Sequence, residues 1–160
     1  MLGTADRAYV AGTSSVNPTR YDSARRSVYL PVVRSAVYEV FQAFDFADPS
    51  VSTARRDATT VAPQALFMMN SPLMLGESRR WAENLVGDPS LNDRGRVQSI
   101  HLGALSRPAT DAEVDRSLQF LKRHLSAQAA AGVDAKERNV KSWQALCRAV
   151  LSSNEFVYVE

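Results

Sequence analysis

The 160-residue chain is long enough for one domain with its own core, because a chain of this size buries roughly 70% of its unfolded surface. Apolar residues make up 45% of the sequence and charged residues 22%, which excludes a disordered polar chain. The formal net charge of +2 is too small to predict nucleic-acid binding, which usually needs a clustered basic face. The sequence has no apolar run near the ~18–20 residues that cross a bilayer, so we expect no membrane span.

Cys147 is the only cysteine in the chain. A single cysteine excludes an internal disulfide, a cysteine-rich zinc site and a Cys-x-x-Cys-His haem attachment within these residues. Cys147 shares a helical face with Trp143 and Val150, so we expect it to be a small buried apolar side chain. We predict no cofactor and no bound metal.

The first half of the chain has little periodicity. We interpret residues 1–24 as an extended lead-in or the remnant of a preceding domain, and residues 25–160 as a single mostly helical domain. Residues 27–33 are rich in β-branched and aromatic side chains but contain Pro31, which favours an edge strand. Apolar residues at helical spacing predict a short helix over residues 35–44.

The second half is strongly periodic and predicts five further helices, over residues 63–69, 72–87, 93–105, 110–132 and 134–154. Ser71 and Pro72 suit a helix cap and a first helical position, and Thr110 with Glu113 forms a capping box. His101 falls on an apolar helix face, which is typical of a hydrogen-bonded histidine at the margin of a core.

The end of the chain suggests a small sheet. Asn154 is expected to stop the last helix, and the β-prone residues 156–159 could pair with residues 27–33. The predicted fold class is therefore mainly α. It is a bundle of about five to six helices with a long ordered loop, and with room for a minor two-stranded β element.

The long loop, residues 45–62, is the candidate binding site, since loops of this length in a compact domain usually have a function. Arg55 and Arg56 offer guanidinium groups beside a helix start, where exposed N–H groups favour anions. Thr59 and Thr60 add hydroxyl groups. Arg55, Arg56, Thr59 and Thr60 are thus candidate anion-binding residues for a sulfate, a phosphate or a uronate.

A structural interpretation of this loop is preferred over the binding one. In it, loop side chains cap the helix while Arg55 or Arg56 pairs with Asp45 or Asp48. The spacing of Asp45, Asp48 and Asp57 matches no EF-hand, and carboxylates in loops that contain proline commonly cap turns. No metal site is therefore predicted from these three carboxylates.

Several motifs, taken in order, resemble one known family. They are Arg25-Arg26-Ser27-Val28-Tyr29-Leu30-Pro31, Phe44-Asp45-Phe46 with Asp48-Pro49, Arg55-Arg56 ahead of Thr59-Thr60-Val61-Ala62-Pro63-Gln64-Ala65-Leu66-Phe67, Asn70-Ser71-Pro72, Arg107-Pro108 before the capping box, and Ser153-Asn154-Glu155-Phe156. Together they resemble the C-terminal domain of unknown function, often called the PSD type, of planctomycete proteins that also carry cytochrome-c-like domains. The resemblance covers about residues 24–160.

The resemblance implies a context and no reaction. Such domains end long exported proteins, behind haem-binding modules, which implies a periplasmic or cell-surface location and the parent protein's other domains as partners. Neighbouring genes often encode sulfatase-like proteins, which implies polysaccharide use and an anionic glycan as a further partner. The family brings no catalytic residues to carry over, and this chain lacks the haem modules.

Two functional hypotheses follow. In the preferred one, the chain is a non-catalytic structural or interaction module of a larger exported protein. In the alternative, it is part of a carbohydrate-active or sulfated-glycan-processing enzyme in which the arginine loop binds the anionic group. Salt-bridged arginines would favour the module, and a deep pocket lined by Arg55, Arg56 and Thr59 would favour the enzyme.

Overall fold

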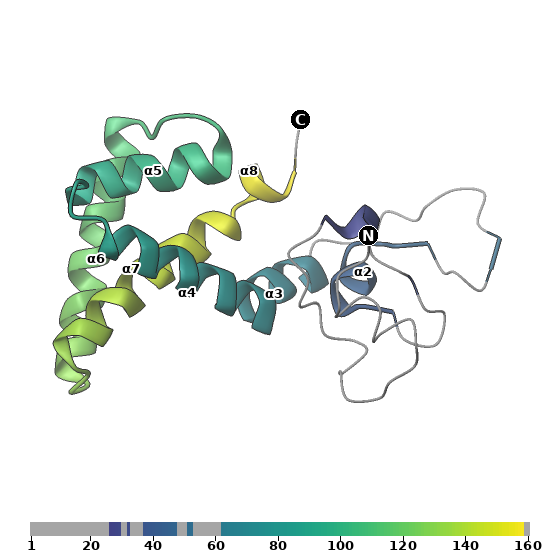
Figure 1. Ribbon diagram of the computed structural model, residues 1–160, viewed down its shortest axis with the longest axis horizontal. Coiled ribbons are helices and arrows are strands. Elements are labelled where there is room, and N and C mark those ends of the chain that lie inside the picture. The colour runs from purple at the N-terminus through teal and green to yellow at the C-terminus, as the bar shows by residue number, and fades with distance from the viewer. Residues whose placement is uncertain (1–25, 30–31, 33–36, 48–50, 53–61, 159–160) are drawn as a thin grey trace. The chain divides into compact units, whose positions relative to one another are not determined.

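The computed structural model describes residues 26–29, 32, 37–47, 51–52 and 62–158. The chain divides into two compact units, Met1–Phe67 and Met68–Glu160. Within the described residues there are seven α-helices, one short 3-10 helix and no strand, so the predicted mainly α fold is confirmed (Figure 1). None of the described helices is long and apolar enough to cross a membrane. The predicted boundary after residue 24 lies outside the described residues and stays a prediction.

The first unit contains η1 (Ser27–Tyr29), α2 (Glu39–Ala43) and the beginning of α3 (Ala62–Asn70). Aromatic rings gather around α2. Phe41 is buried there, meets the Tyr38 ring edge-on at 5.5 Å and stacks on Phe46 at 5.0 Å. Asp45, with φ of 53°, takes the left-handed conformation that aspartate tolerates, and the Phe46 N–H then donates to the Phe41 carbonyl over 2.9 Å. The helix predicted over residues 35–44 is thus present in a shorter form.

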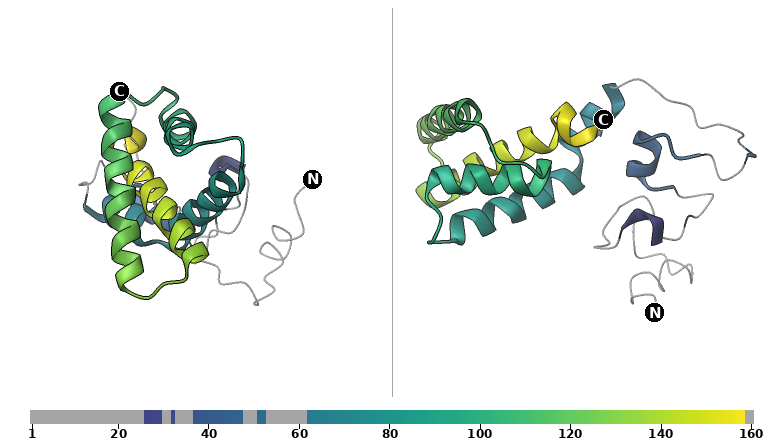
Figure 2. Two further views of the ribbon diagram at one scale, coloured as in Figure 1. Left: turned by 90° about the vertical axis from the view of Figure 1, so that its left-hand side faces the viewer. Right: turned by 90° about the horizontal axis from the view of Figure 1, so that it is seen from above.

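The second unit is a bundle arranged around α7. It contains α4 (Pro72–Gly87), α5 (Asp93–Leu105), α6 (Asp111–Ala130), α7 (Ala135–Leu151) and the single-turn α8 (Asn154–Val157). Helix α7 packs against each of the other four, and Figure 2 shows it lying between α4 and α6. The core is continuous along this contact, with Val97 and Ile100 of α5, Val114 of α6 and Cys147 of α7 fully buried.

The helix starts follow the predicted capping chemistry. The Ser71 hydroxyl accepts from the Met74 N–H over 3.3 Å, with proline at the first helical position. Thr110 and Glu113 form the predicted capping box at the start of α6. Such caps satisfy backbone N–H groups that have no partner within their own helix.

The minor two-stranded β element is not present in the described residues. Ser27–Tyr29 forms a 3-10 turn, and Asn154–Val157 forms helix α8. Asn154 begins this helix and does not act as a left-handed stop, because α7 already ends at Leu151. The last turn then satisfies its backbone locally, since the Tyr158 N–H donates to the Asn154 carbonyl over 2.8 Å. Local hydrogen bonding thus replaces the strand pairing that β propensity favoured.

Candidate functional site

The candidate anion-binding residues of the loop lie outside the described residues. This holds for Arg55, Arg56, Thr59 and Thr60. It also holds for Asp48 and Asp57, so the expected pairing of the loop arginines stays a prediction. Within the described parts of the chain, no three His, Cys, Asp or Glu side chains come together as a metal site. The described chemistry of the molecule lies instead in the second unit.

Arg107 is the most highly connected side chain of that unit. Its Nη1 and Nη2 atoms donate to the Glu113 carboxylate over 3.0 and 2.8 Å, and Nη2 also donates to Glu155 Oε2 over 2.7 Å. Its Nε donates to the second oxygen of Glu155. One guanidinium therefore holds two carboxylates, which joins the turn between α5 and α6 to helix α8. Planar bidentate pairing of this kind suits arginine and not lysine.

Glu113 takes part in two structures at once. It completes the capping box of α6, where its carboxylate accepts from the Thr110 N–H over 2.7 Å and from the Thr110 hydroxyl over 2.8 Å. The hydrogen bonds from Arg107, followed by those from Thr110, hold the pKa of Glu113 well below its usual range. Arg107 likewise lowers the pKa of Glu155. Both carboxylates are therefore held as anions near neutral pH and do not serve as proton donors.

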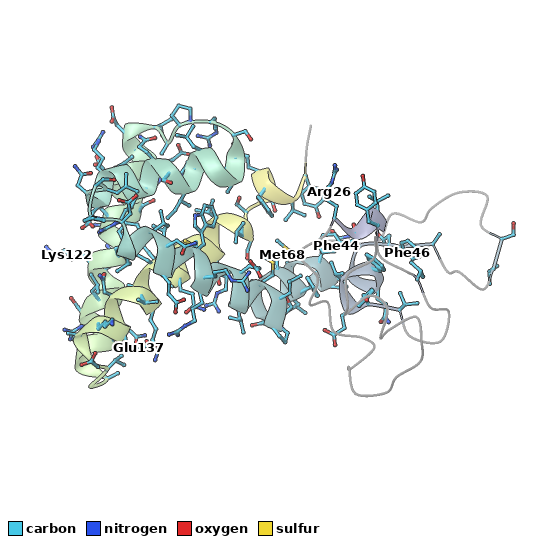
Figure 3. All side chains as sticks on the ribbon, in the orientation of Figure 1. Arg26, Phe44, Phe46, Met68, Lys122 and Glu137 are labelled. Carbon is cyan, nitrogen blue, oxygen red and sulfur yellow. The ribbon has the colours of Figure 1, made fainter. Side chains whose placement is uncertain are left out.

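A second arginine joins α4 to α7. Arg79 donates through Nη1 and Nη2 to the two oxygens of Glu137 over 2.9 and 3.1 Å, and through Nε to Glu83 over 2.9 Å. Glu137 lies near the start of α7 (Figure 3). The hydrogen bond to Arg79 lowers the pKa of Glu137. This pair crosses between helices that are far apart in the sequence, so it fixes their mutual register.

Arg96 closes the end of α4. Its Nε donates to the Leu85 carbonyl over 2.8 Å and its Nη2 to the Asp88 carbonyl over 3.3 Å, while Nη1 pairs with Asp93 over 2.9 Å. The guanidinium carbon lies 5.8 Å from the centre of the Trp143 ring. Carbonyls at a helix end have no hydrogen-bond donor within the helix, so Arg96 supplies donors to carbonyls at the end of α4.

The two histidines have structural partners. His101 is 5% exposed, and its Nδ1 lies 3.0 Å from the Val97 carbonyl, which only accepts, so Nδ1 carries the proton. The Ser142 hydroxyl donates to the Arg138 carbonyl over 2.8 Å, so the Nδ1 of His124, 3.0 Å from Ser142 Oγ, is again the donor. The expected core-margin histidine at position 101 is confirmed.

Cys147 is fully buried, as its helical face predicted. Burial raises the pKa of its thiol to about 12. A thiol nucleophile reacts as the thiolate, and burial keeps Cys147 in the protonated form at neutral pH. Cys147 therefore acts as a small core side chain.

Two open hollows lie on the surface of the second unit. The larger, about 550 Å³, lies between α4 and α7 and is lined by Arg79, Glu83, Glu137 and the apolar Val86 and Val140 among others. In this hollow, Arg79 pairs with both Glu83 and Glu137. The smaller, about 380 Å³, is lined by Glu77, Arg80, Trp81, Asn84, Gly103 and Leu151. We call this second hollow the Trp81 groove.

A family model described as PSD1, protein of unknown function (DUF1553), matches residues 1–121, which is more than half of the chain. The chain belongs to this family. The expected resemblance to a PSD-type domain of unknown function is thereby confirmed, although the match begins at residue 1 and not near residue 24. Comparison with the curated proteins and with the solved structures gives no match.

The contacts of Arg107 extend beyond the residues that match the PSD1 model. Arg107 and Glu113 fall within the matched residues, whereas Glu155 and the motif around it lie beyond residue 121. Two of the motifs that carried the resemblance therefore touch each other through the Arg107–Glu155 pair. Sequence reasoning identified both motifs without predicting that they meet.

Proposed function

We propose that this PSD1 chain is a non-catalytic structural or interaction module of a larger exported protein. One observation carries the proposal: the charged and nucleophilic side chains best suited to chemistry in the second unit are bound to, or buried within, the same fold. Arg107 and Arg79 each hold two carboxylates, and Cys147 is sealed in the core. The two arginines join helices of the unit, and the cysteine fills its core.

The histidines support the same proposal. In an acid–base enzyme a histidine must reach a substrate, with a pKa suited to transferring a proton. His101 is covered, and its Nδ1 proton is bound to the backbone of its own helix. The Nδ1 proton of His124 is bound to Ser142, whose hydroxyl is bound to α7 in turn. Each histidine thus joins neighbouring turns or helices.

The wider context of the proposal comes from the family resemblance. We place the module at the C-terminus of an exported planctomycete protein with cytochrome-c-like domains, located in the periplasm or at the cell surface. Its partners in this proposal are the other domains of that parent protein. The alternative role, in a carbohydrate-active enzyme that binds an anionic glycan, depends on Arg55, Arg56, Thr59 and Thr60, which lie outside the described residues.

Trans-binding and turnover measurements test the module role. The 160-residue chain is titrated calorimetrically with the separately produced remainder of the parent protein, and saturable binding is the expected result.

In the intact parent, His124→Gln should leave any glycan turnover within about twofold, because general acid–base groups contribute roughly a hundredfold or more. The matched control is Gln119→Ala, an exposed change on the same helix. Absence of binding, or a hundredfold loss in His124→Gln at unchanged Tm, would contradict the module.

A further inference from the structure

The Trp81 groove combines charged, amide and aromatic side chains of one helix. Its α4 residues are Glu77, Arg80, Trp81 and Asn84. Their spacing of three, one and three places them on one face of α4. Gly103 of α5 and the nearly buried Leu151 of α7 complete the lining. Three helices therefore meet at this hollow, and its volume of about 380 Å³ falls within the range of small-ligand sites, roughly 300–1,000 Å³.

Trp81 lies close to α5 at Gly103. A Cβ atom added at Gly103 would lie 3.0 Å from Trp81 Cζ2, tighter than nine in ten such contacts, so any larger residue would require the ring to shift by a few tenths of an ångström. Trp81 packs against the core but stays partly exposed. A ring that is already fixed loses little conformational entropy when a ligand stacks on it.

The polar lining of the groove is electrically neutral. Arg80 Nη1 donates to both oxygens of Glu77, over 3.1 and 3.2 Å, so these two charges offset each other. Asn84 is exposed, and within the described residues its amide makes no hydrogen bond. A free amide offers two donors and an acceptor side by side. Directional polar groups thus surround a fixed aromatic ring without a net charge.

This combination selects a class of ligand. A strong anion would compete with Glu77 for Arg80, and a cation would compete with Arg80 for Glu77. A purely apolar peptide would leave the polar lining unsatisfied, which is costly. A neutral ring with an apolar C–H face and hydroxyl groups along its edge satisfies both the indole and the planar polar side chains. Sugar pyranose rings have this chemistry.

We propose that the Trp81 groove is a binding site for a neutral sugar unit, which stacks on Trp81 and hydrogen-bonds to Asn84 and to the Glu77–Arg80 pair. The proposal goes beyond the module role, because it assigns a ligand class to a described surface. It also differs from the anionic glycan expected at residues 45–62, since it uses none of the loop arginines. Binding here would let the chain attach to a carbohydrate without cleaving it.

The experiment uses the 160-residue chain and three neutral probes: cellohexaose, xylohexaose and mannohexaose. Tryptophan fluorescence is the first readout, because Trp143 is only 2% exposed and Trp81 should therefore dominate any change. Calorimetry gives the affinity independently. Asn84→Ala is the main variant, since it removes an exposed amide from a helix and introduces a good helix former. Gln119→Ala removes an exposed amide from α6 and is the matched control.

The expected result is a saturable fluorescence change with at least one of the three hexasaccharides. Asn84→Ala should weaken that binding about three- to tenfold, the effect of losing one net hydrogen bond, while Gln119→Ala leaves it unchanged. Trp81→Phe should weaken it as well, and circular dichroism checks that this variant is folded. The proposal is overturned if no neutral probe binds, or if Asn84→Ala binds as tightly as the unaltered chain. Since no domain of the parent is present, this outcome is independent of the test of the module role.

Discussion

Arg107 and Glu155 are 48 positions apart in the sequence, yet they share two hydrogen bonds that attach the final short helix to the rest of the bundle. Helix α8 is a single turn, and helices this short are not stable alone in water. Its place beside α5 and α7 therefore depends on contacts with the rest of the unit, of which this pair is one. Arg107 is thus a specific point at which the end of the chain can be released.

We predict that Arg107→Ala frees α8 while leaving the remaining bundle folded. Amide hydrogen exchange of Phe156, Val157 and Tyr158 should become faster, because their N–H groups are bonded only within this last turn. Arg94→Ala is the matched control, since it removes a single exposed ion pair, with Asp111, from the neighbouring turn. Equal exchange rates at α8 in the two variants would show that Arg107 does not hold it.

The Glu113 carboxylate should make stability depend on pH. Folding lowers its pKa below the ordinary value of 4.5, so its contribution is complete above that pH and is lost as the pH falls toward the folded-state pKa. Glu113→Gln keeps the shape of a capping box but cannot ionise. We expect a lower Tm for this variant at neutral pH, and a gap that narrows as the pH falls below about 4.5. Thermal melts followed by circular dichroism measure this difference in Tm. A Tm difference that stays constant with pH would contradict a role for the Glu113 charge.

Helix α5 offers a matched pair for its buried and exposed faces. Ile100 is fully buried and Leu102 is 54% exposed. Ile100→Ala should lower the free energy of unfolding by about 2–5 kcal/mol, because it removes buried methylenes and leaves a cavity. Leu102→Ala should change it by less than about 0.5 kcal/mol. Urea denaturation measures both, and similar midpoints for the two variants would be inconsistent with this core.

Two glycines test the close approach at the Trp81 groove. Gly76, inside α4, has nothing within 4 Å of an added Cβ, so Gly76→Ala should stabilise the chain by about 0.5–1 kcal/mol through helix propensity. Gly103→Ala offers the same gain in α5 but drives the new methyl into the Trp81 ring. We expect no net stabilisation and a shifted Trp81 emission maximum. If urea denaturation gave the same increase in the free energy of unfolding for both variants, the Trp81 ring would have moved aside at no cost.

The sequence predicted the features that depend on near neighbours. The Ser71 cap with Pro72 and the capping box at Thr110 are present because each needs only residues within one helical turn. The buried state of Cys147 followed from its helical face in the same way. Local chemistry was less reliable at the end of the chain, where β-prone residues form α8 because the backbone there bonds to itself.

Long-range pairs could not be predicted. Arg79 and Glu137 are 58 positions apart, and neither sits in a motif that names its partner. Trp81 packs against the core and also lines a groove with polar residues of α4, and helical periodicity alone does not distinguish these two roles. The four candidate anion-binding residues, Arg55, Arg56, Thr59 and Thr60, lie outside the described residues, so that site stays a prediction.

The central position of α7 has a consequence for how the protein is made. Helices α4, α5 and α6 are complete in the growing chain before α7 is synthesised, yet each of them packs against α7. Until residues 135–151 leave the ribosome, the surfaces that contact α7, above all that of α4, are uncovered, and the Arg79 guanidinium lacks Glu137. Exposed apolar surface of this kind promotes aggregation and chaperone binding during synthesis. The second unit is therefore expected to fold late and in one step, when its last long helix arrives.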